Sequence, residues 1–151
     1  MRVPAPRPRR RKRREPRRIL IVNGVTVWRE ALSSRINRSS GLKVCGEAIG
    51  EAVAFEMVRR LRPNPVLTEI MRPQDLGFVR ELHQHNPLLP ILVFSFRDEE
   101  AYAPKVLDAG ARGYLAKGVD GDTLVAGIRK VLNERMVLSP GMAARLRRKV
   151  V

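Results

Sequence analysis

The feature that most limits the fold of this sequence is a regular alternation of short apolar runs with longer amphipathic stretches. The first run, residues 19–22, is apolar at every position and ends in Asn23 and Gly24. Continuous apolar character is typical of a strand that is buried on both faces of a parallel sheet. Parallel neighbours need a crossover of about a dozen residues or more, so the amphipathic stretches between runs are expected to be helices.

The alternation continues through most of the chain. Strands are predicted at residues 19–22, 42–45, 66–68, 90–95 and 112–116, and helices at 26–38, 51–62, 78–85, 98–109 and 122–134. Asp120 is the expected N-cap of the last of these helices. Pro104 falls within the fourth predicted helix, which therefore either begins late, with Pro104 near its first position, or is kinked. The pattern predicts an α/β fold with a doubly wound, five-stranded parallel sheet.

Function in such a sheet lies at the carboxyl ends of the central strands. The side chains that end the predicted strands are therefore the first candidates for a site. Asn23 and Gly24 follow the first strand, Glu69 follows the third, Ser95 ends the fourth and Lys117 follows the fifth.

Four stretches in this order resemble the response regulator receiver family, which belongs to the CheY-like superfamily. They are residues 18–22, residues 62–73 with Pro73, the run AGARGYLAK at 109–117, and VLSP at 137–140. The likeness covers residues 18–135 and is greatest to the NarL/FixJ type. It implies the flavodoxin-like receiver fold and a role in two-component phosphorelay signalling.

The departures from the family pattern lie at the site itself. The resemblance implies two adjacent acids after the first strand that hold magnesium, but Asn23 and Gly24 stand there. The aspartate that accepts the phosphoryl group is replaced by Glu69. Magnesium favours charged oxygen ligands, so we expect its binding to be lost and expect no other cofactor. These departures indicate a degenerate pseudo-receiver that works independently of phosphorylation.

Other residues match the family's readout of phosphorylation. Lys117 matches the lysine that pairs with the phosphoryl group, Ser95 the switch hydroxyl, and Tyr114 the aromatic residue that turns inward on activation. One interpretation is that Glu69 imitates the phosphorylated state by reaching Lys117 and Ser95, with a charged hydrogen bond that contributes about 1.5–3 kcal/mol. The other is that Glu69 forms only a structural ion pair.

The net charge of +15 is distributed unevenly. Residues 1–18 hold ten Lys or Arg and one acid, and four prolines fall within residues 1–17. Such a segment has little apolar surface to bury, so residues 1–17 are predicted to be a disordered tail. The tail is either a solvated extension or an arm that contacts phosphates of DNA or RNA. The candidate contacts are Arg9, Arg10, Arg11, Lys12, Arg13 and Arg14.

The remaining candidates favour packing rather than chemistry. Trp28 is expected to pack in the core and Cys45 to be a buried strand residue. His83 and His85 are expected to be solvated, because residues two apart on a helix do not face each other. Residues 18–135 are expected to form the receiver-like domain. Residues 136–151 would form a linker with a short helix that carries Arg145, Arg147, Arg148 and Lys149.

The sequence holds no Walker motif, no dinucleotide-binding glycine pattern and no nucleophile–base pair, so we do not expect an enzyme. The preferred hypothesis is a signalling module that binds a protein partner or forms a homodimer through the fourth and fifth helices and the fifth strand. The alternative is a nucleic-acid-binding protein, or a truncated NarL/FixJ-type transcription regulator, that uses the basic tail. A membrane span and a secretory signal are not expected, and we expect a cytoplasmic protein.

Overall fold

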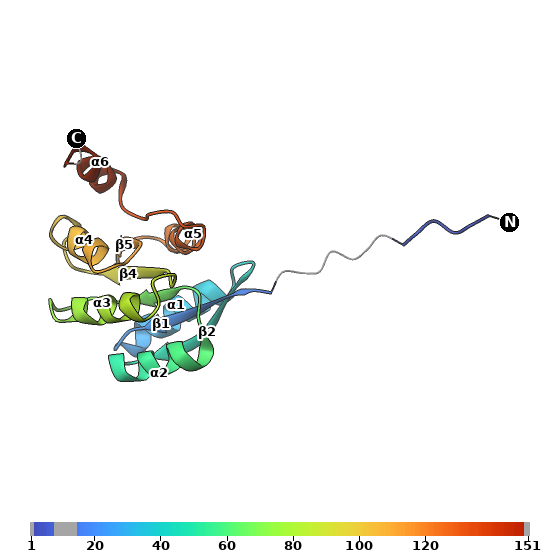
Figure 1. Cartoon of the computed structure of the whole chain (residues 1–151), viewed down its shortest axis with the longest axis horizontal. Coiled ribbons are helices and arrows are strands. Elements are labelled where there is room, and N and C mark those ends of the chain that lie inside the picture. The colour runs from blue at the N-terminus through green and yellow to red at the C-terminus, as the bar shows by residue number, and fades with distance from the viewer. Residues whose placement is uncertain (1, 8–14, 150–151) are drawn as a thin grey trace.

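The computed structural model of the chain describes residues 2–7 and 15–149 (Figure 1). Strands and helices alternate along it as the sequence predicts. The strands are β1 (Arg17–Val22), β2 (Leu42–Ala48), β3 (Val66–Thr68), β4 (Ile91–Ser95) and β5 (Gly113–Ala116). The helices are α1 (Thr26–Asn37), α2 (Glu51–Leu61), α3 (Asp75–His85), α4 (Glu99–Asp108), α5 (Gly121–Leu132) and α6 (Pro140–Lys149). No helix in the described part of the chain is long and apolar enough to cross a bilayer.

The five strands form one sheet in the order β2-β1-β3-β4-β5, and every neighbouring pair is parallel. The predicted doubly wound parallel sheet is therefore confirmed. The order reverses between β1 and β3, because the chain first moves outward to β2 and then returns to the other side of β1. In sheets of this kind, the crevice at such a reversal is where ligands bind.

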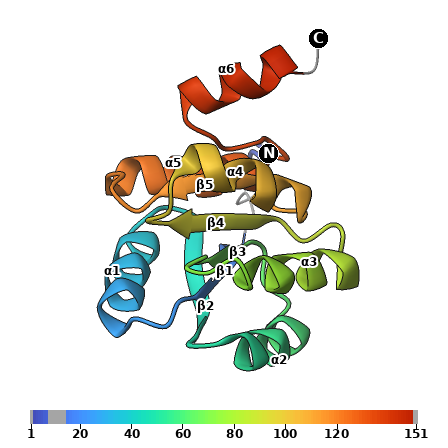
Figure 2. The same cartoon turned by 90° about the vertical axis from the view of Figure 1, so that its left-hand side faces the viewer.

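Two helical layers cover the sheet, with α1 and α5 on one face and α2, α3 and α4 on the other (Figure 2). Alternate residues of β1 feed the two resulting cores. Ile19 and Ile21 pack toward α1 and α5, whereas Leu20 and Val22 pack toward α2, α3 and α4. A strand with both faces covered needs apolar residues at every position, which explains the continuous run that opens the domain.

Val27 and Val53, which begin the helical spacing of apolar residues in α1 and α2, do not join the core. Val27 is 72% exposed and Val53 is 45% exposed. Both lie in the first turn of their helices, beside the carboxyl edge of the sheet, where a side chain has less of the sheet to pack against. The spacing of apolar residues shows which face of a helix is apolar, but it does not show how much of the helix's length packs against the sheet.

The fourth helix does not begin at Pro104, so the expected late start is wrong. The Asp98 side chain accepts a hydrogen bond from the backbone N–H of Ala101 at 3.2 Å and caps the helix, which begins at Glu99. Acidic residues in the first turn also stabilise the start of the helix, because their negative charges are attracted to the positive end of the helix dipole. Pro104 lies inside the helix.

Two smaller expectations also need correction. Cys45 is only half-buried, and burial raises the pKa of its thiol against the opposing charge of Arg18. His83 is not fully solvated: its ring lies where a Cβ atom at Gly110 would stand, and its Nδ1 atom is buried. Gly110, at φ +112°, allows this close approach. His85 is exposed.

The C-terminal helix α6 lies against α4. Met142 is buried, and Leu138 and Leu146 pack against the same core as the α4 residue Ala103. Polar contacts reinforce this packing: Ser139 hydrogen-bonds the carboxylate of Glu99, and Arg145 pairs with Glu100. Thus α6 covers part of the outer surface of α4.

Gly113 is a sensitive point of this architecture. A Cβ atom there would lie 2.6 Å from Val137 Cβ and 2.7 Å from its carbonyl oxygen, because β5 and the segment after α5 run side by side. We expect Gly113→Ala to lower the free energy of unfolding by about 1–3 kcal/mol, the usual cost of overpacking. Urea denaturation followed by circular dichroism measures this change.

Gly77→Ala is the matched control. A Cβ atom at Gly77 meets nothing within 4 Å, and the residue lies inside α3. The substitution should raise stability by about 0.5–1 kcal/mol, because alanine loses less backbone entropy in a helix. Equal stability of the two variants would contradict the close packing at Gly113.

Candidate functional site

A buried ion pair lies at the carboxyl edge of the sheet. The Nζ atom of Lys117, which follows β5, donates to Oε1 of Glu69, which follows β3. The Lys117 side chain is 1% exposed and that of Glu69 is 7% exposed. Because β1, β3, β4 and β5 are consecutive in the sheet, their carboxyl ends bring these residues together, although 48 positions separate them in the sequence.

Three aromatic rings surround the Lys117 ammonium. Its Nζ atom lies 4.8 Å from the ring centroid of Trp28, 4.7 Å from that of Phe96 and 5.9 Å from that of Phe94. Trp28 itself meets Phe96 edge to face at 5.3 Å. Ring faces attract cations, and the attraction grows when water is excluded. The lysine is therefore held between one carboxylate and an aromatic cage, and the expected packing role of Trp28 includes this contact.

Asn23 is buried beside the ion pair and shapes the start of α1. Its Oδ1 atom accepts a hydrogen bond from the backbone N–H of Val25 at 2.8 Å, and its carbonyl oxygen accepts one from Arg29 at 2.8 Å. In the described chain, Asn23 Nδ2 is a buried donor without a partner, and Glu69 Oε2 is a buried acceptor without one. An amide in this corner adds no charge, whereas a second carboxylate would repel Glu69.

These residues do not fit the magnesium ion that the receiver resemblance implies. Gly24 has no side chain, Asn23 Oδ1 is engaged by Val25, and Glu69 Oε1 is engaged by Lys117. Among residues 2–7 and 15–149, no group of three His, Cys, Asp or Glu side chains is placed to hold a metal. A hard divalent cation prefers several charged oxygen ligands.

Ser95 is buried at the end of β4 but is not joined to Glu69. Its hydroxyl donates to the carbonyl oxygen of Ile70 and accepts from the backbone N–H of Arg97 at 3.1 Å. Of the two partners expected for the Glu69 carboxylate, the structure brings Lys117 into contact and leaves Ser95 bonded to the loop after β3. The hydroxyl thereby ties the two loops on either side of the site together.

Tyr114 lies inside the domain, with none of its surface exposed. Its hydroxyl donates to the carbonyl oxygen of Arg97, and the Arg97 Nε atom donates to the carbonyl oxygen of Met71 at 2.7 Å. Burial raises the pKa of the Tyr114 hydroxyl. This chain of bonds connects β5 through the loop before α4 to the loop that contains Glu69.

Asp75 and the ring of Phe96 are parts of the site that sequence reasoning did not identify. Asp75 accepts hydrogen bonds at 2.9 Å from the backbone N–H groups of Met71 and Arg72, and so holds the loop after Glu69. Burial alone would raise the pKa of Asp75, but these bonds and the Arg72 charge together lower it. The Asp75 bonds lie within one connection, between β3 and α3, whereas the Phe96 ring reaches Lys117 only where the loops after β4 and β5 meet.

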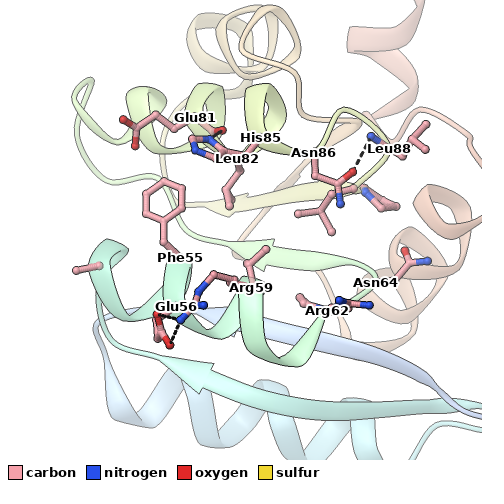
Figure 3. A pocket seen from close by; sticks show the side chains of 15 residues that line it. Phe55, Glu56, Arg59, Arg62, Asn64, Glu81, Leu82, His85, Asn86 and Leu88 are labelled. Carbon is pink, nitrogen blue, oxygen red and sulfur yellow. Dashed lines mark hydrogen bonds and ion pairs between the residues drawn. The ribbon is translucent and has the colours of Figure 1, made fainter.

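Two hollows adjoin the site. One, of about 390 Å³, is lined by Asn23, Gly24 and Glu69, and a smaller one of about 210 Å³ lies between Glu69 and Phe96. A larger hollow, of about 940 Å³, lies elsewhere, between α2 and α3 (Figure 3). Phe55 of α2 and Leu82 of α3 line it, and none of the predicted site residues does.

The basic residues predicted to bind nucleic acid, Arg9, Arg10, Arg11, Lys12, Arg13 and Arg14, lie outside the described residues. The C-terminal basic residues Arg145, Arg147 and Arg148 are on α6, away from the ion pair.

Comparison with known proteins gives a consistent result for residues 19–129, which match the family described as the response regulator receiver domain. The transcriptional regulatory protein DegU of Brevibacillus brevis is 29% identical over 124 residues, which are 81% of this chain and 52% of that protein. The response regulator GacA of Pseudomonas aeruginosa is 27% identical over 131 residues, 85% of this chain and 61% of that protein. The chain thus spans between half and two thirds of the length of these curated relatives.

Solved structures agree. A two-component response regulator of the LuxR family from Aurantimonas sp. superposes with a TM-score of 0.80 at 28% identity, over 89% of this chain and 98% of that chain. The signal receiver domain of NarL from Mycobacterium tuberculosis superposes with a TM-score of 0.74 at 23% identity, over 80% of this chain and 99% of that chain. The second likeness bears on the fold alone.

The buried ion pair predicts a specific response to mutation. Glu69→Gln leaves the Lys117 charge buried without a carboxylate, so we expect a loss of about 3 kcal/mol in the free energy of unfolding, as when other buried pairs lose one partner. Adding Lys117→Met removes the stranded charge and should recover most of that loss. Urea denaturation of the natural protein, Glu69→Gln, Lys117→Met and the double variant completes the double-mutant cycle.

Glu56→Gln serves as the control, because Glu56 pairs with Arg59 on the exposed surface of α2. Exposed pairs contribute little, so this variant should unfold like the natural protein. If Glu69→Gln were as harmless as Glu56→Gln, the Lys117–Glu69 pair would not be holding the site together.

Proposed function

Because this chain belongs to the response regulator receiver family, we propose that it is an atypical receiver module of two-component signalling that acts through protein contacts without being phosphorylated. Membership in the family carries the general role in two-component signal transduction. Independence from phosphorylation goes further, and it rests on the chemistry of the edited site.

The observation that carries the proposal is the buried pair of Glu69 with Lys117. Phosphoryl transfer depends on neutralising charge around the phosphorus, largely by a metal ion. Here Asn23 and Gly24 supply no carboxylate for a metal, and the Glu69 oxygen nearest Lys117 is already paired. A donor would therefore meet a paired carboxylate and no site for the metal that assists the reaction.

The Glu69 carboxylate takes over the place of a phosphoryl group in this proposal. It contacts Lys117 directly, while Tyr114 is buried with its hydroxyl bonded to the loop before α4. An inward aromatic ring is the arrangement that the family resemblance associates with activation. The proposal thus favours a constitutively active state of the domain over a purely structural ion pair. Measurements of self-association and of the free energy of unfolding together distinguish these two interpretations.

The proposed output surface is formed by α4, β5 and α5. In this structure α6 already covers part of α4, held by Ser139 on Glu99 and by Arg145 on Glu100. A protein partner or a second copy would therefore use the α5 side of this surface first, or displace α6. The NarL/FixJ type and a role in transcription regulation also belong to the proposal, and the likeness to the transcriptional regulatory protein DegU supports them.

Exposure to a small-molecule phosphodonor tests whether the domain is phosphorylated. With acetyl phosphate and magnesium, the natural protein should show no phosphoryl adduct by intact-mass spectrometry, because no metal site assists attack by Glu69. The triple variant Asn23→Asp, Gly24→Asp and Glu69→Asp should gain a magnesium-dependent adduct, in which a carboxylate oxygen bonds phosphorus and acetate leaves. Space permits the change, since a Cβ atom at Gly24 meets only Ile49 O, at 3.7 Å.

The variant Gly24→Asp alone is the control, because it adds one acid without the acceptor aspartate. It should remain unmodified. A magnesium-dependent adduct on Glu69 of the natural protein would contradict phosphorylation independence directly.

Self-association in solution tests the proposed output surface. If the bonds from Tyr114 to Arg97 hold an active-like surface, sedimentation velocity should show self-association that weakens in Tyr114→Phe, which keeps the ring and removes the hydroxyl. Ser33→Ala, on α1, removes a hydroxyl that bonds Glu47 of β2, at the other side of the sheet from the output surface, and should leave assembly unchanged. Equal assembly of both variants and the natural protein would separate Tyr114 from the output surface.

A further inference from the structure

The edge of the sheet opposite the candidate site carries a strong excess of positive charge. This edge is formed by the start of β1 and the connections that follow the helices α1, α2, α3, α4 and α5. Those connections, residues 38–41, 62–65, 86–90, 109–112 and 133–136, contain four arginines and one acid, Glu134. β1 adds Arg17 and Arg18 at its first two positions.

Four arginines of this edge are fixed in place by main-chain oxygens. Arg18 donates to the carbonyl of Leu61 at 2.7 Å, Arg38 to that of Ser34 at 3.2 Å, and Arg129 to that of Ser40 at 2.9 Å. Arg112 donates to the carbonyls of Val131 and Leu88. Except for the local bond of Arg38 within the end of α1, these bonds reach a different segment of the edge, so they join those segments into one surface. Carbonyls at helix ends orient a guanidinium without neutralising it.

Other basic side chains stand on the same edge without such partners. In the described part of the chain, no side-chain hydrogen bond or ion pair is recorded for Arg17, Arg60, Arg62, Lys130 or Arg135. Away from this edge, Arg35, Arg72 and Arg145 each pair with an acid, whereas Lys105, Arg147 and Arg148 pair with none among the residues that the structure describes. Complementing helix dipoles explains a basic residue in the last turn of a helix, but not the excess of basic residues over the two acids of this edge, Asp108 at the end of α4 and Glu134.

We propose that this edge binds the phosphate backbone of duplex DNA without reading its sequence. The basic edge comprises Arg17, Arg18, Arg38, Arg112, Arg129 and the partner-free basic residues beside them. Strands lie about 4.8 Å apart, so the five-stranded edge extends about 20 Å. A duplex carries one phosphate charge per about 1.7 Å of its axis, so that length presents about a dozen charges. The array of fixed and free cations matches such a target in extent and sign.

A duplex fits this edge better than a single strand or a membrane. Single strands are held by stacking of bases on aromatic rings, and the five connections contain no Phe, Tyr or Trp. Membrane binding needs a broad apolar face, whereas the exposed large apolar side chains here are Leu88 and Met136 alone among those connections.

The test measures binding of the whole 151-residue chain to a fluorescein-labelled DNA duplex by fluorescence anisotropy. The edge variant is Arg60→Gln, Lys130→Gln and Arg135→Gln, all exposed residues without recorded side-chain bonds. The control variant removes the same charge elsewhere, through Lys105→Gln, Arg147→Gln and Arg148→Gln on α4 and α6. Circular dichroism checks that both remain folded.

The natural protein should bind with a steep dependence on salt between about 50 and 200 mM, because each phosphate contact releases counterions. The edge variant should bind more weakly, with the slope of log K against log salt reduced by up to about 2.7, which corresponds to three contacts at about 0.9 each. The control variant should retain the natural slope.

Three outcomes would overturn the inference. They are equal slopes for the edge variant and the natural protein, a reduction confined to the control variant, and binding to phosphatidylserine-containing vesicles without binding to the duplex. None of these outcomes bears on the proposal for Glu69, because the Glu69 site and the basic edge lie at opposite edges of the sheet.

Discussion

The charge of Lys117, held out of water, is the constraint on which the candidate site depends. A lysine with a 1% exposed side chain is tolerated only where a carboxylate and polarisable surroundings replace its lost hydration. Glu69 supplies the carboxylate, and the rings of Trp28, Phe94 and Phe96 supply the surroundings. The lysine therefore draws together residues from α1, β3, β4 and β5, and the ion pair is as much a part of the fold as of any signalling mechanism.

The bonds around this pair form a path toward the surface of α4. The Ser95 hydroxyl bonds Ile70, Arg97 bonds Met71, and the Tyr114 hydroxyl bonds Arg97. These contacts join the loop that follows Glu69 to the loop that precedes α4. The loop that carries Glu69 is therefore bonded to the residues that precede α4, the helix on which α6 packs.

Much of the site followed from the sequence because parallel topology places strand ends at one edge. Glu69 and Lys117 were expected to approach each other, and the structure brings them into contact. Ser95 was expected to share Glu69, but its hydroxyl bonds a main-chain carbonyl instead. A hydroxyl has several partners within reach at the end of a strand, and only the path of the neighbouring loop selects one. The aromatic cage around Lys117 was missed for the same reason.

By itself the sequence determined the order and type of the elements, the doubly wound parallel sheet and the set of strand-end residues. These are local or topological properties, set by apolar runs, helical spacing and the geometry of crossovers. Only the tertiary structure decided that Val27 is exposed, that Pro104 lies inside α4 and that α6 rests on α4. It alone also revealed the basic edge, because residues distant in sequence form one surface only after the helices return to the same end of the sheet.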